Sequence, residues 1–165
     1  MLSRLLLSLL LLILPFNSFA FIEGKGSKDP IEITANELLV YKKRNQAIFI
    51  GNVKAVQKDT TLFSDKMVVK YKNNNSAKQS EKIEKIDAEG NVKIITPKEI
   101  ATGKRGTYQA DNGIFKLFDE VKLQQEGAEL FGDVFIHDTK TGKSDLLSNG
   151  SKKPKERAKA IITPK

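Results

Sequence analysis

Residues that could support catalysis or metal binding are few in this sequence. His137 is the only histidine and cysteine is absent, which excludes a multi-histidine metal site and a cysteine nucleophile. Asp119 and Glu120 resemble the carboxylate pair of a glycosidase, but neighbours on a strand face opposite sides. The segment Gly103-Lys-Arg-Gly106 lacks the strand-to-helix setting of a phosphate loop. We therefore expect no enzyme, no cofactor and no metal site, and we interpret His137 as an ordinary structural or surface residue.

Two short motifs recur along the chain with constant spacing. A Gly-Asn-Val or Asp-Glu-Val triplet leads each copy, and a second element follows fourteen residues after the triplet begins. The triplets begin at Gly51, Gly90 and Asp119, and the second elements contain Asp65, Lys104 and Asp133. A further second element, Ala35-Asn-Glu-Leu38, precedes the first triplet, so two strand types alternate. We interpret Asp65 and Asp133 as turn formers that bond to local backbone N–H groups.

Alternation of apolar and polar residues predicts that the chain is built of short strands. Phe115, Leu117, Val121 and Leu123 fall on one parity, and no apolar stripe at helical spacing exceeds two turns. Gly-Asn and Asp-Glu in mid-strand are poor strand formers, so they predict bulges or sharp bends that curve the strands around a common axis. The fold class is therefore all-β, with one polar loop expected over residues 72–85.

The first twenty residues have the pattern of a secretory signal peptide. Arg4 precedes an uncharged run from Leu5 to Leu14, and Ser18-Phe-Ala20 provides small residues where a signal peptidase reads them. We expect cleavage after Ala20, a flexible segment over residues 21–29 and one folded domain over residues 30–150. An uncleaved membrane anchor near residues 5–22 is the alternative, because the extended apolar run approaches a membrane span.

Positive charge is concentrated at the C-terminus. Of the net charge of +8, Arg4 contributes one and the tail of residues 151–165 a net five, which leaves about +2 on the folded body. We predict that this tail is basic and disordered. The alternative is a binder of nucleic acid or anionic surfaces that uses the basic residues of the tail. Such a binder would use Lys152, Lys153, Lys155, Arg157 and Lys159.

One apolar parity on every strand predicts a continuous apolar trough in the interior. An acyl chain of about a dozen methylenes would gain several kcal/mol in it, at roughly 25 cal/mol per Å² removed from water. A closed core, in which the same residues pack on one another, is the competing interpretation. The residues of this parity are Ile31, Ile33, Leu38, Val40, Phe49, Val53, Leu62, Met67, Val69, Val92, Ile94, Tyr108, Phe115, Leu117, Val121, Leu123, Leu130 and Phe135.

The two ends of such a stack of strands should be able to pair onward. Edge strands present unpaired N–H and C=O groups, which are either capped or paired with another chain. Ile31-Glu-Ile33 at the start and Val134-Phe-Ile136 at the end are apolar enough for such pairing. We therefore expect end-to-end association.

Several of these segments, taken in order, resemble a known family. Pro30–Leu38, Ala47–Val53 and Phe63–Val69 resemble the lipopolysaccharide-transport protein A (LptA) family of OstA-like periplasmic proteins, and Gly132–Gly142 looks like its closing element. The resemblance covers about residues 30–142. The chain departs from the usual Gly-Asn pair at its third copy, where it has Asp119-Glu120.

The resemblance implies a twisted, incomplete β-jelly roll whose copies join head to tail in the periplasm. The implied function is a bridge that carries lipopolysaccharide from the inner to the outer membrane, with the lipid A acyl chains inside the roll. The implied partners are LptC-like and LptD-like jelly rolls, joined by end-to-end strand pairing, and no nucleic acid is expected. The resemblance also matches Ile31 to the family's first strand and Ile95, Tyr108 and Ala110 to interior positions, although parity favours Ile94 over Ile95. A membrane-anchored, LptC-like inner-membrane partner of the same bridge is the alternative.

Overall fold

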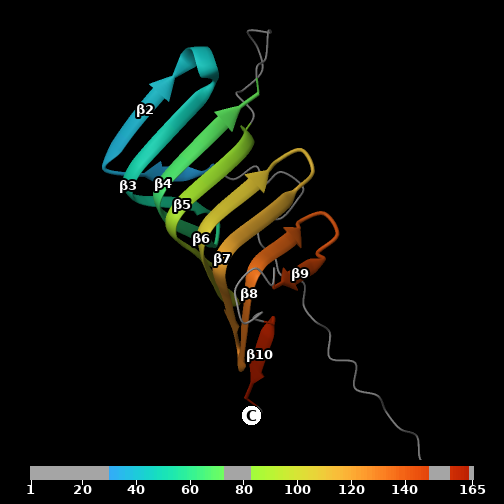
Figure 1. Ribbon diagram of the computed structural model, residues 1–165. Coiled ribbons are helices and arrows are strands. Elements are labelled where there is room, and N and C mark those ends of the chain that lie inside the picture. Colours follow the sequence, from blue (N-terminus) through green and yellow to red (C-terminus); the bar gives the residue numbers. More distant parts are fainter. Residues whose placement is uncertain (1–29, 73–82, 149–156, 164–165) are drawn as a thin grey trace, which may run out of the picture.

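The computed structural model describes residues 30–72, 83–148 and 157–163, and all its strands belong to one antiparallel sheet (Figure 1). The predicted signal peptide of residues 1–20, the segment 21–29, most of the predicted loop and residues 149–156 and 164–165 lie outside the described residues. Within the described part, no helix is long and apolar enough to cross a bilayer.

The sheet follows the chain order from one strand to the next. The path of paired strands is β1-β3-β4-β5-β6-β7-β8-β10, while β2 pairs with β3 and β9 pairs with β8. The strands are β1 (Glu32–Thr34), β2 (Glu37–Tyr41), β3 (Gln46–Gln57), β4 (Thr60–Tyr71), β5 (Ile83–Ile95), β6 (Glu99–Gln109), β7 (Ile114–Gln125), β8 (Ala128–Asp138), β9 (Ser144–Leu147) and β10 (Lys159–Ile162), with a 3-10 turn over Lys42–Arg44. The prediction of an all-β fold is confirmed.

Each of the central strands bends near its middle, at the recurring motifs. On β3, β5 and β7 two consecutive residues with positive φ bulge opposite a single residue of the next strand. The bulged pairs are Gly51-Asn52, Gly90-Asn91 and Asp119-Glu120, and the single residues opposite them are Asp65, Lys104 and Asp133. The predicted bends are therefore present, but the strands run through them unbroken. The six central strands are 11 to 13 residues long, rather than short.

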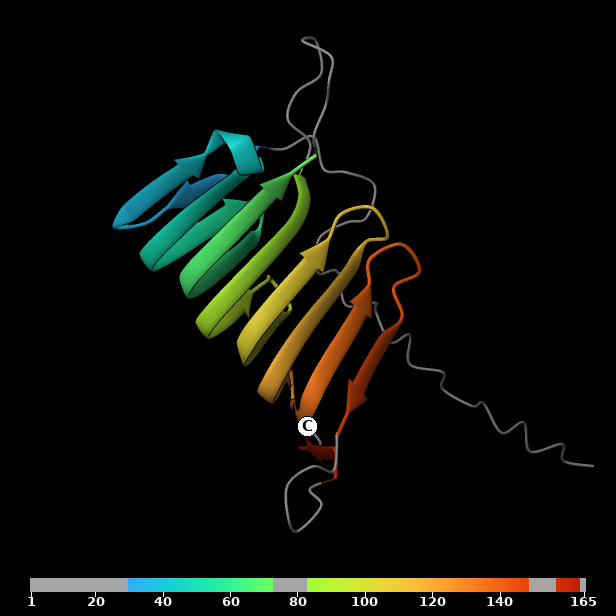
Figure 2. The ribbon, with the colours of Figure 1, turned by 45° about the horizontal axis from the view of Figure 1, so that its top comes forward.

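The bends stack in register and curl the sheet into an open roll, which Figures 1 and 2 show from two directions. Two groups of buried apolar side chains fill its inner face. One group centres on Phe115, Leu117 and Phe135 from the C-terminal strands. The other centres on Phe49, Met67 and Val69 from the N-terminal strands, and Leu62 packs against both. The two halves of the core are therefore continuous through β4.

The C-terminal tail differs from the prediction of a disordered segment. Residues 159–162 form β10, which pairs antiparallel with residues 128–131 of β8, and the Thr163 N–H donates to the Gly127 carbonyl at 2.7 Å. Alternation in Lys-Ala-Ile-Ile was too short a signal to identify this strand in the sequence. The prediction is wrong for this segment because the β8 edge offers hydrogen-bond partners that an isolated tail lacks.

Candidate functional site

An apolar cleft lies on the inner face of the roll, between β1 and the central strands. Its enclosed part has a volume of about 70 Å³, and the empty volume reaches about 660 Å³ when the open mouth is included. The lining is almost entirely apolar. It consists of Ile31, Ile33, Ala55, Val56, Gln57, Thr60, Leu62, Met67, Ile86, Ala88, Ile94, Gly106, Thr107, Tyr108 and Phe115.

Seven residues predicted to line the trough are brought together in this cleft. They are Ile31, Ile33, Leu62, Met67, Ile94, Tyr108 and Phe115. A second set belongs to the packed core around the cleft rather than to its lining. That set is Phe49, Val53, Val69, Val92, Leu117, Val121, Leu123 and Phe135, which are buried, and Leu130, which packs against them. The structure thus contains both the closed core and the open trough that the sequence left as alternatives.

Four other predicted residues lie away from the cleft. Leu38 and Val40 on β2 pair with Phe49 and Ala47, so they share the inner face, but they are 54% and 62% exposed at the free edge. Ala110 is half-buried just beyond the end of β6.

Ile95 also lies outside the cleft, and it differs from its neighbour Ile94. Ile94 pairs with Leu62 and Ala101 on the inner face, whereas Ile95 pairs with Thr61 and Ile100 on the opposite face. The structure therefore places Ile94, and not Ile95, on the interior side.

Sequence reasoning missed the small residues that make the cleft hollow. Ala88 and Gly106 are cross-strand partners in the lining, and a Cβ atom built on Gly106 would lie 3.4 Å from side-chain atoms of Leu117 and Val92. Because these two residues have almost no side chain, the inner face is depressed between the larger residues around them. The recurrence of alanine at the inward parity, as in Ala55 and Ala88, was the available signal.

Tyr108 is an aromatic residue of the cleft lining whose hydroxyl lies next to the Thr139 side chain. It pairs with Phe115 across β6 and β7 and is half-buried. Burial raises the pKa of its phenol, and a hydrogen bond with the Thr139 side chain acts in the opposite direction. The hydroxyl is therefore neutral at physiological pH and can donate or accept a hydrogen bond.

His137 is a buried member of the inner face and not a surface residue. It is 1% exposed, pairs with Phe115, and stacks on Phe135 with ring centroids 6.3 Å apart. Its Nδ1 lies 2.9 Å from the Ser144 Oγ. Burial lowers the pKa of the imidazole, so the ring stays neutral at pH values where an ordinary histidine would begin to take up a proton. These contacts agree with a structural role.

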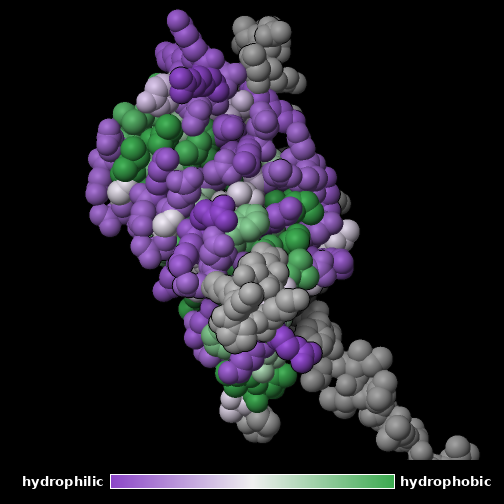
Figure 3. Space-filling view, in the orientation of Figure 1, coloured by the Kyte–Doolittle hydropathy of each residue, from purple (hydrophilic) through white to green (hydrophobic). Residues whose placement is uncertain are grey.

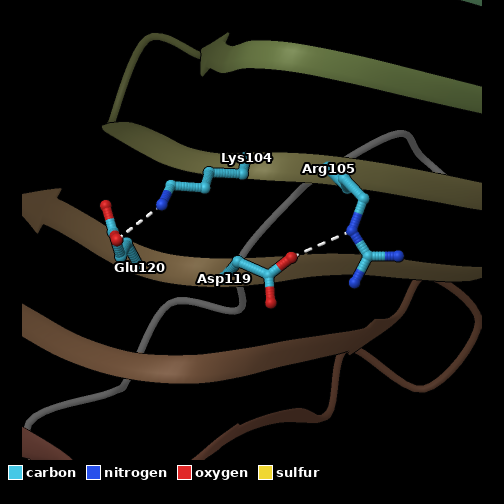
Figure 4. A network of polar contacts seen from close by, with 4 residues as sticks. All are labelled: Lys104, Arg105, Asp119 and Glu120. Carbon is cyan, nitrogen blue, oxygen red and sulfur yellow. Dashed lines mark hydrogen bonds and ion pairs between the residues drawn. The ribbon is translucent and has the colours of Figure 1, made fainter.

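The adjacent carboxylates Asp119 and Glu120 are held in ion pairs on the outer side of the bend (Figure 4). Lys104 Nζ lies 2.6 Å from Glu120 Oε1, and Arg105 Nε lies 2.9 Å from Asp119 Oδ2. Both carboxylates are exposed to a large extent and are already paired with the two cations. These ion pairs join the neighbouring strands β6 and β7 at the bend.

Asp65 and Asp133 stabilise the bends by contacts between strands, which corrects their interpretation as local turn formers. Asp65 Oδ2 accepts a hydrogen bond from Asn91 Nδ2 at 2.9 Å, and Asp133 Oδ2 accepts one from Ser148 Oγ at 3.2 Å. In the part of the chain that the structure describes, no group of three or more His, Cys, Asp or Glu residues could hold a metal ion.

Apolar residues also reach the surface at the two ends of the sheet. Figure 3 shows apolar side chains at the surface near β2 and again near β10, where Leu38, Val40, Ile161 and Ile162 are exposed. At each end the last strand has one edge without a partner strand among the described residues. Exposed apolar strands with a free edge are typical of surfaces that pair with another chain.

The open roll with an apolar interior cleft defines the chain as an LptA-like β-jelly roll. A crystal structure of LptH from Pseudomonas aeruginosa, described as the LptA-homologous periplasmic component of the lipopolysaccharide transport device, superimposes with a TM-score of 0.69. The match covers 82% of this chain and 96% of that chain at 20% sequence identity, so it shows the fold.

The chain belongs to the family described as LptA/(LptD N-terminal domain) LPS transport protein, whose model matches residues 32–143. The family resemblance inferred from the sequence is therefore confirmed. An uncharacterized protein of Rhizobium meliloti (strain 1021) is 32% identical over 108 residues. That match covers 64% of this chain and 58% of the length of the relative.

Proposed function

We propose that this chain is a periplasmic lipopolysaccharide-binding transport protein that holds lipid A acyl chains in the cleft of its roll. The observation that carries the proposal is the open apolar cleft on the inner face, which a sheet of this kind would otherwise close with larger side chains. Membership of a lipopolysaccharide-transport family supports the same function. The family consists of transport proteins, and the proposal requires no catalytic group.

The energetics of the cleft favour hydrocarbon over water. Transfer of one methylene from water to an apolar site contributes about 0.8 kcal/mol, so part of one acyl chain is enough for several kcal/mol. The enclosed volume of about 70 Å³ is small for a lipid. We therefore expect β1, which has only three residues and carries Ile33, to move outward together with the preceding Ile31 when an acyl chain enters.

The free edges support a bridge between the two membranes. β1 and β2 expose edges at one end of the sheet, and β9 and β10 expose edges at the other. Pairing of one end with the opposite end of another jelly roll would extend the inner face from copy to copy. The proposed partners are further copies of this chain, an LptC-like inner-membrane protein and an LptD-like outer-membrane protein.

The proposed location requires export and removal of the signal peptide after Ala20. Sequencing the N-terminus of the mature protein tests this point, because a protein that begins at Phe21 carries no anchor. An intact N-terminus in the membrane fraction would favour the LptC-like alternative instead.

Photo-crosslinking from the cleft tests the lipid-binding proposal directly. A photoreactive phenylalanine replaces Tyr108, which lines the cleft, in cells that make radiolabelled lipopolysaccharide. The matched control replaces Lys116, which lies between two inward residues of the adjacent strand β7 and faces the other side. We expect a labelled adduct from position 108 only. Equal labelling at both positions, or none at 108, would contradict the proposal.

Filling the cleft provides a second test. Ala55→Trp places a large ring in the lining, whereas Lys54→Trp adds the same ring to the exposed face of the same strand. We expect the first substitution to reduce lipopolysaccharide binding at least tenfold and the second to leave it unchanged. Circular dichroism and thermal unfolding of both variants show whether the roll is intact.

A further inference from the structure

A row of mostly polar residues runs across the strands on the inner face of the roll. It lies beside a parallel row of apolar residues, two positions further along each strand. The cross-strand register places Ala55, Leu62, Ile94, Ala101, Leu123 and Leu130 in the apolar row. Two residues further along the strands, the corresponding positions are Gln57 and Thr60, Thr96 and Glu99, and Gln125, and the polar row ends at the apolar Ala128 of β8. Gln57 and Thr60 also line the cleft, so this polar row lies at the level where one end of the cleft finishes.

Glu99 is the unusual member of the polar row. Its position two residues before the buried Ala101 places it on the inner face, and it is only 7% exposed. Its Oε1 atom is buried and has no hydrogen-bond partner among the residues that the structure describes. A buried polar atom without a partner destabilises a fold, so such a group calls for an explanation, and a polar group of a bound ligand is one.

The backbone around Glu99 is already satisfied and does not compete for the carboxyl group. The Glu99 N–H donates to Thr96 Oγ1 at 3.1 Å, and the Glu99 carbonyl accepts from the Thr96 N–H at 3.0 Å. These bonds fix the position of the side chain at the start of β6. Burial raises the pKa of Glu99 to about 7, although the positive charge of the exposed Lys98 opposes the shift.

The hydrogen-bonding groups and the charge of the polar row determine which ligand groups can bind beside it. A carboxyl group and amides offer acceptors and donors to hydroxyl and amide groups. The polar row contains no lysine or arginine, and a buried carboxylate repels a phosphate oxygen. A neutral, hydroxyl-rich group therefore complements the row, whereas an anionic head does not.

We propose that the polar row centred on Glu99 recognises the hydroxyl or amide groups of an acylated sugar and discriminates against lipids whose head at this position is a phosphate. The inference rests on the proposed function, in which the neighbouring cleft holds the acyl chains. The alkyl chain lies against the apolar row, and the sugar end lies one step further along the strands, where the Glu99 carboxyl exchanges hydrogen bonds with it.

Two probes with the same alkyl chain test this discrimination. Binding of dodecyl glucoside and of dodecyl phosphate is measured by calorimetry at pH 7.5, below the concentration at which either forms micelles. We expect the full chain to bind the glucoside about tenfold more tightly than the phosphate. Glu99→Gln keeps the shape and hydrogen bonding but removes the charge, so phosphate binding should improve and the ratio should fall severalfold.

Two further variants complete the experiment. Glu99→Leu should weaken binding of the glucoside, because it removes the hydrogen-bonding partner. Glu89→Gln is the matched control, since it removes an exposed carboxylate that pairs with Lys66 elsewhere on the adjacent strand β5, and it should leave the ratio unchanged.

The outcomes separate the inference from the proposed function. If the unmodified chain binds both probes equally, or if the Glu99 variants leave their ratio unchanged, the recognition role of Glu99 is overturned while lipid binding stands. If neither probe binds, the proposed function fails, and the recognition role of Glu99 is overturned with it.

Discussion

Arg105 Nε donates to Asp119 Oδ2 at 2.9 Å across the third bend of the roll, where the first two bends have glycine in place of the aspartate (Figure 4). Asp119 and Glu120 adopt φ values of 64° and 52°, a conformation that residues other than glycine and asparagine rarely adopt. Lys104 and Arg105 on the facing strand pair with both carboxylates. The third copy of the motif thus holds its bend with charge pairs where the others use glycine and asparagine.

The third bend should tolerate a return to the Gly-Asn pair. Asp119→Gly with Glu120→Asn relieves the backbone strain, worth about 1–2 kcal/mol, and removes two exposed ion pairs that contribute little to stability. We expect the free energy of unfolding in urea to rise by about 1 kcal/mol and to depend less on salt. Glu89→Gln is the control, because it breaks an exposed ion pair without changing any bend. A loss of stability in the double variant would contradict this account.

Glycine at the second bend is required for two separate reasons. Gly90 has a φ of +76°, and a Cβ atom there would collide with the Asp65 side chain. Gly90→Ala should therefore lower the free energy of unfolding by about 2–3 kcal/mol. In an Asp65→Ala background the colliding carboxyl atoms are gone and only the Cβ contact at 2.9 Å remains, so we expect the same substitution to lower stability by a smaller amount, about 1–2 kcal/mol. Equal losses in the two backgrounds would show that the collision does not matter.

Bends and strands were predictable from the sequence because their signals are local. The triplets at Gly51, Gly90 and Asp119 and the alternation around Phe115 each depend on a few neighbouring residues. The interior parity was predictable for the same reason, and it separated Ile94 from Ile95. These local signals were enough to indicate the fold class and the family.

Features that depend on contacts between distant strands were not predictable. β10 forms only because the β8 edge is close to it, and the cleft exists because Ala88 and Gly106 become neighbours across β5 and β6. The isolation of the Glu99 carboxyl also depends on the whole row around it. Alternation marks which face a residue takes, but it does not show whether a facing side chain will fill the space.

The buried Glu99 carboxyl should give the fold a characteristic dependence on pH. Its pKa is near the ordinary 4.5 in the unfolded chain and about 7 in the folded one, so the folded form binds the extra proton between these values. Stability contributed by the protonated group is therefore full below about pH 4.5 and is lost as the pH rises through 7. The change is up to about 3 kcal/mol.

Glu99→Gln isolates this contribution, because the variant cannot ionise at position 99. Buried His137, whose pKa is lowered, acts in the opposite direction in both proteins and cancels in the difference. We expect the variant to gain stability relative to the unmodified chain as the pH rises from 5 to 8 in urea titrations. A constant difference across this range would rule out a buried, proton-binding Glu99.

Removal of β10 should expose a strand edge and promote association. β10 covers residues 128–131 of β8, and its own side chains are exposed, so it contributes backbone hydrogen bonds more than apolar burial. We expect deletion of residues 157–165 to leave the roll folded but to make its sedimentation coefficient rise more steeply with concentration than that of the unmodified chain between about 10 and 100 μM, since the newly uncovered β8 edge pairs with a second chain.

Two point variants distinguish loss of the strand from loss of charge in that experiment. Ile161→Pro keeps the basic charge of the tail but removes a backbone donor that faces β8, since Thr163 two residues further along donates to the Gly127 carbonyl, so it should associate as the deletion does. Lys159→Ser removes a charge and preserves the strand, so it should sediment like the unmodified chain. If Lys159→Ser associates and the proline variant does not, the tail limits association through its charge and not by covering the β8 edge.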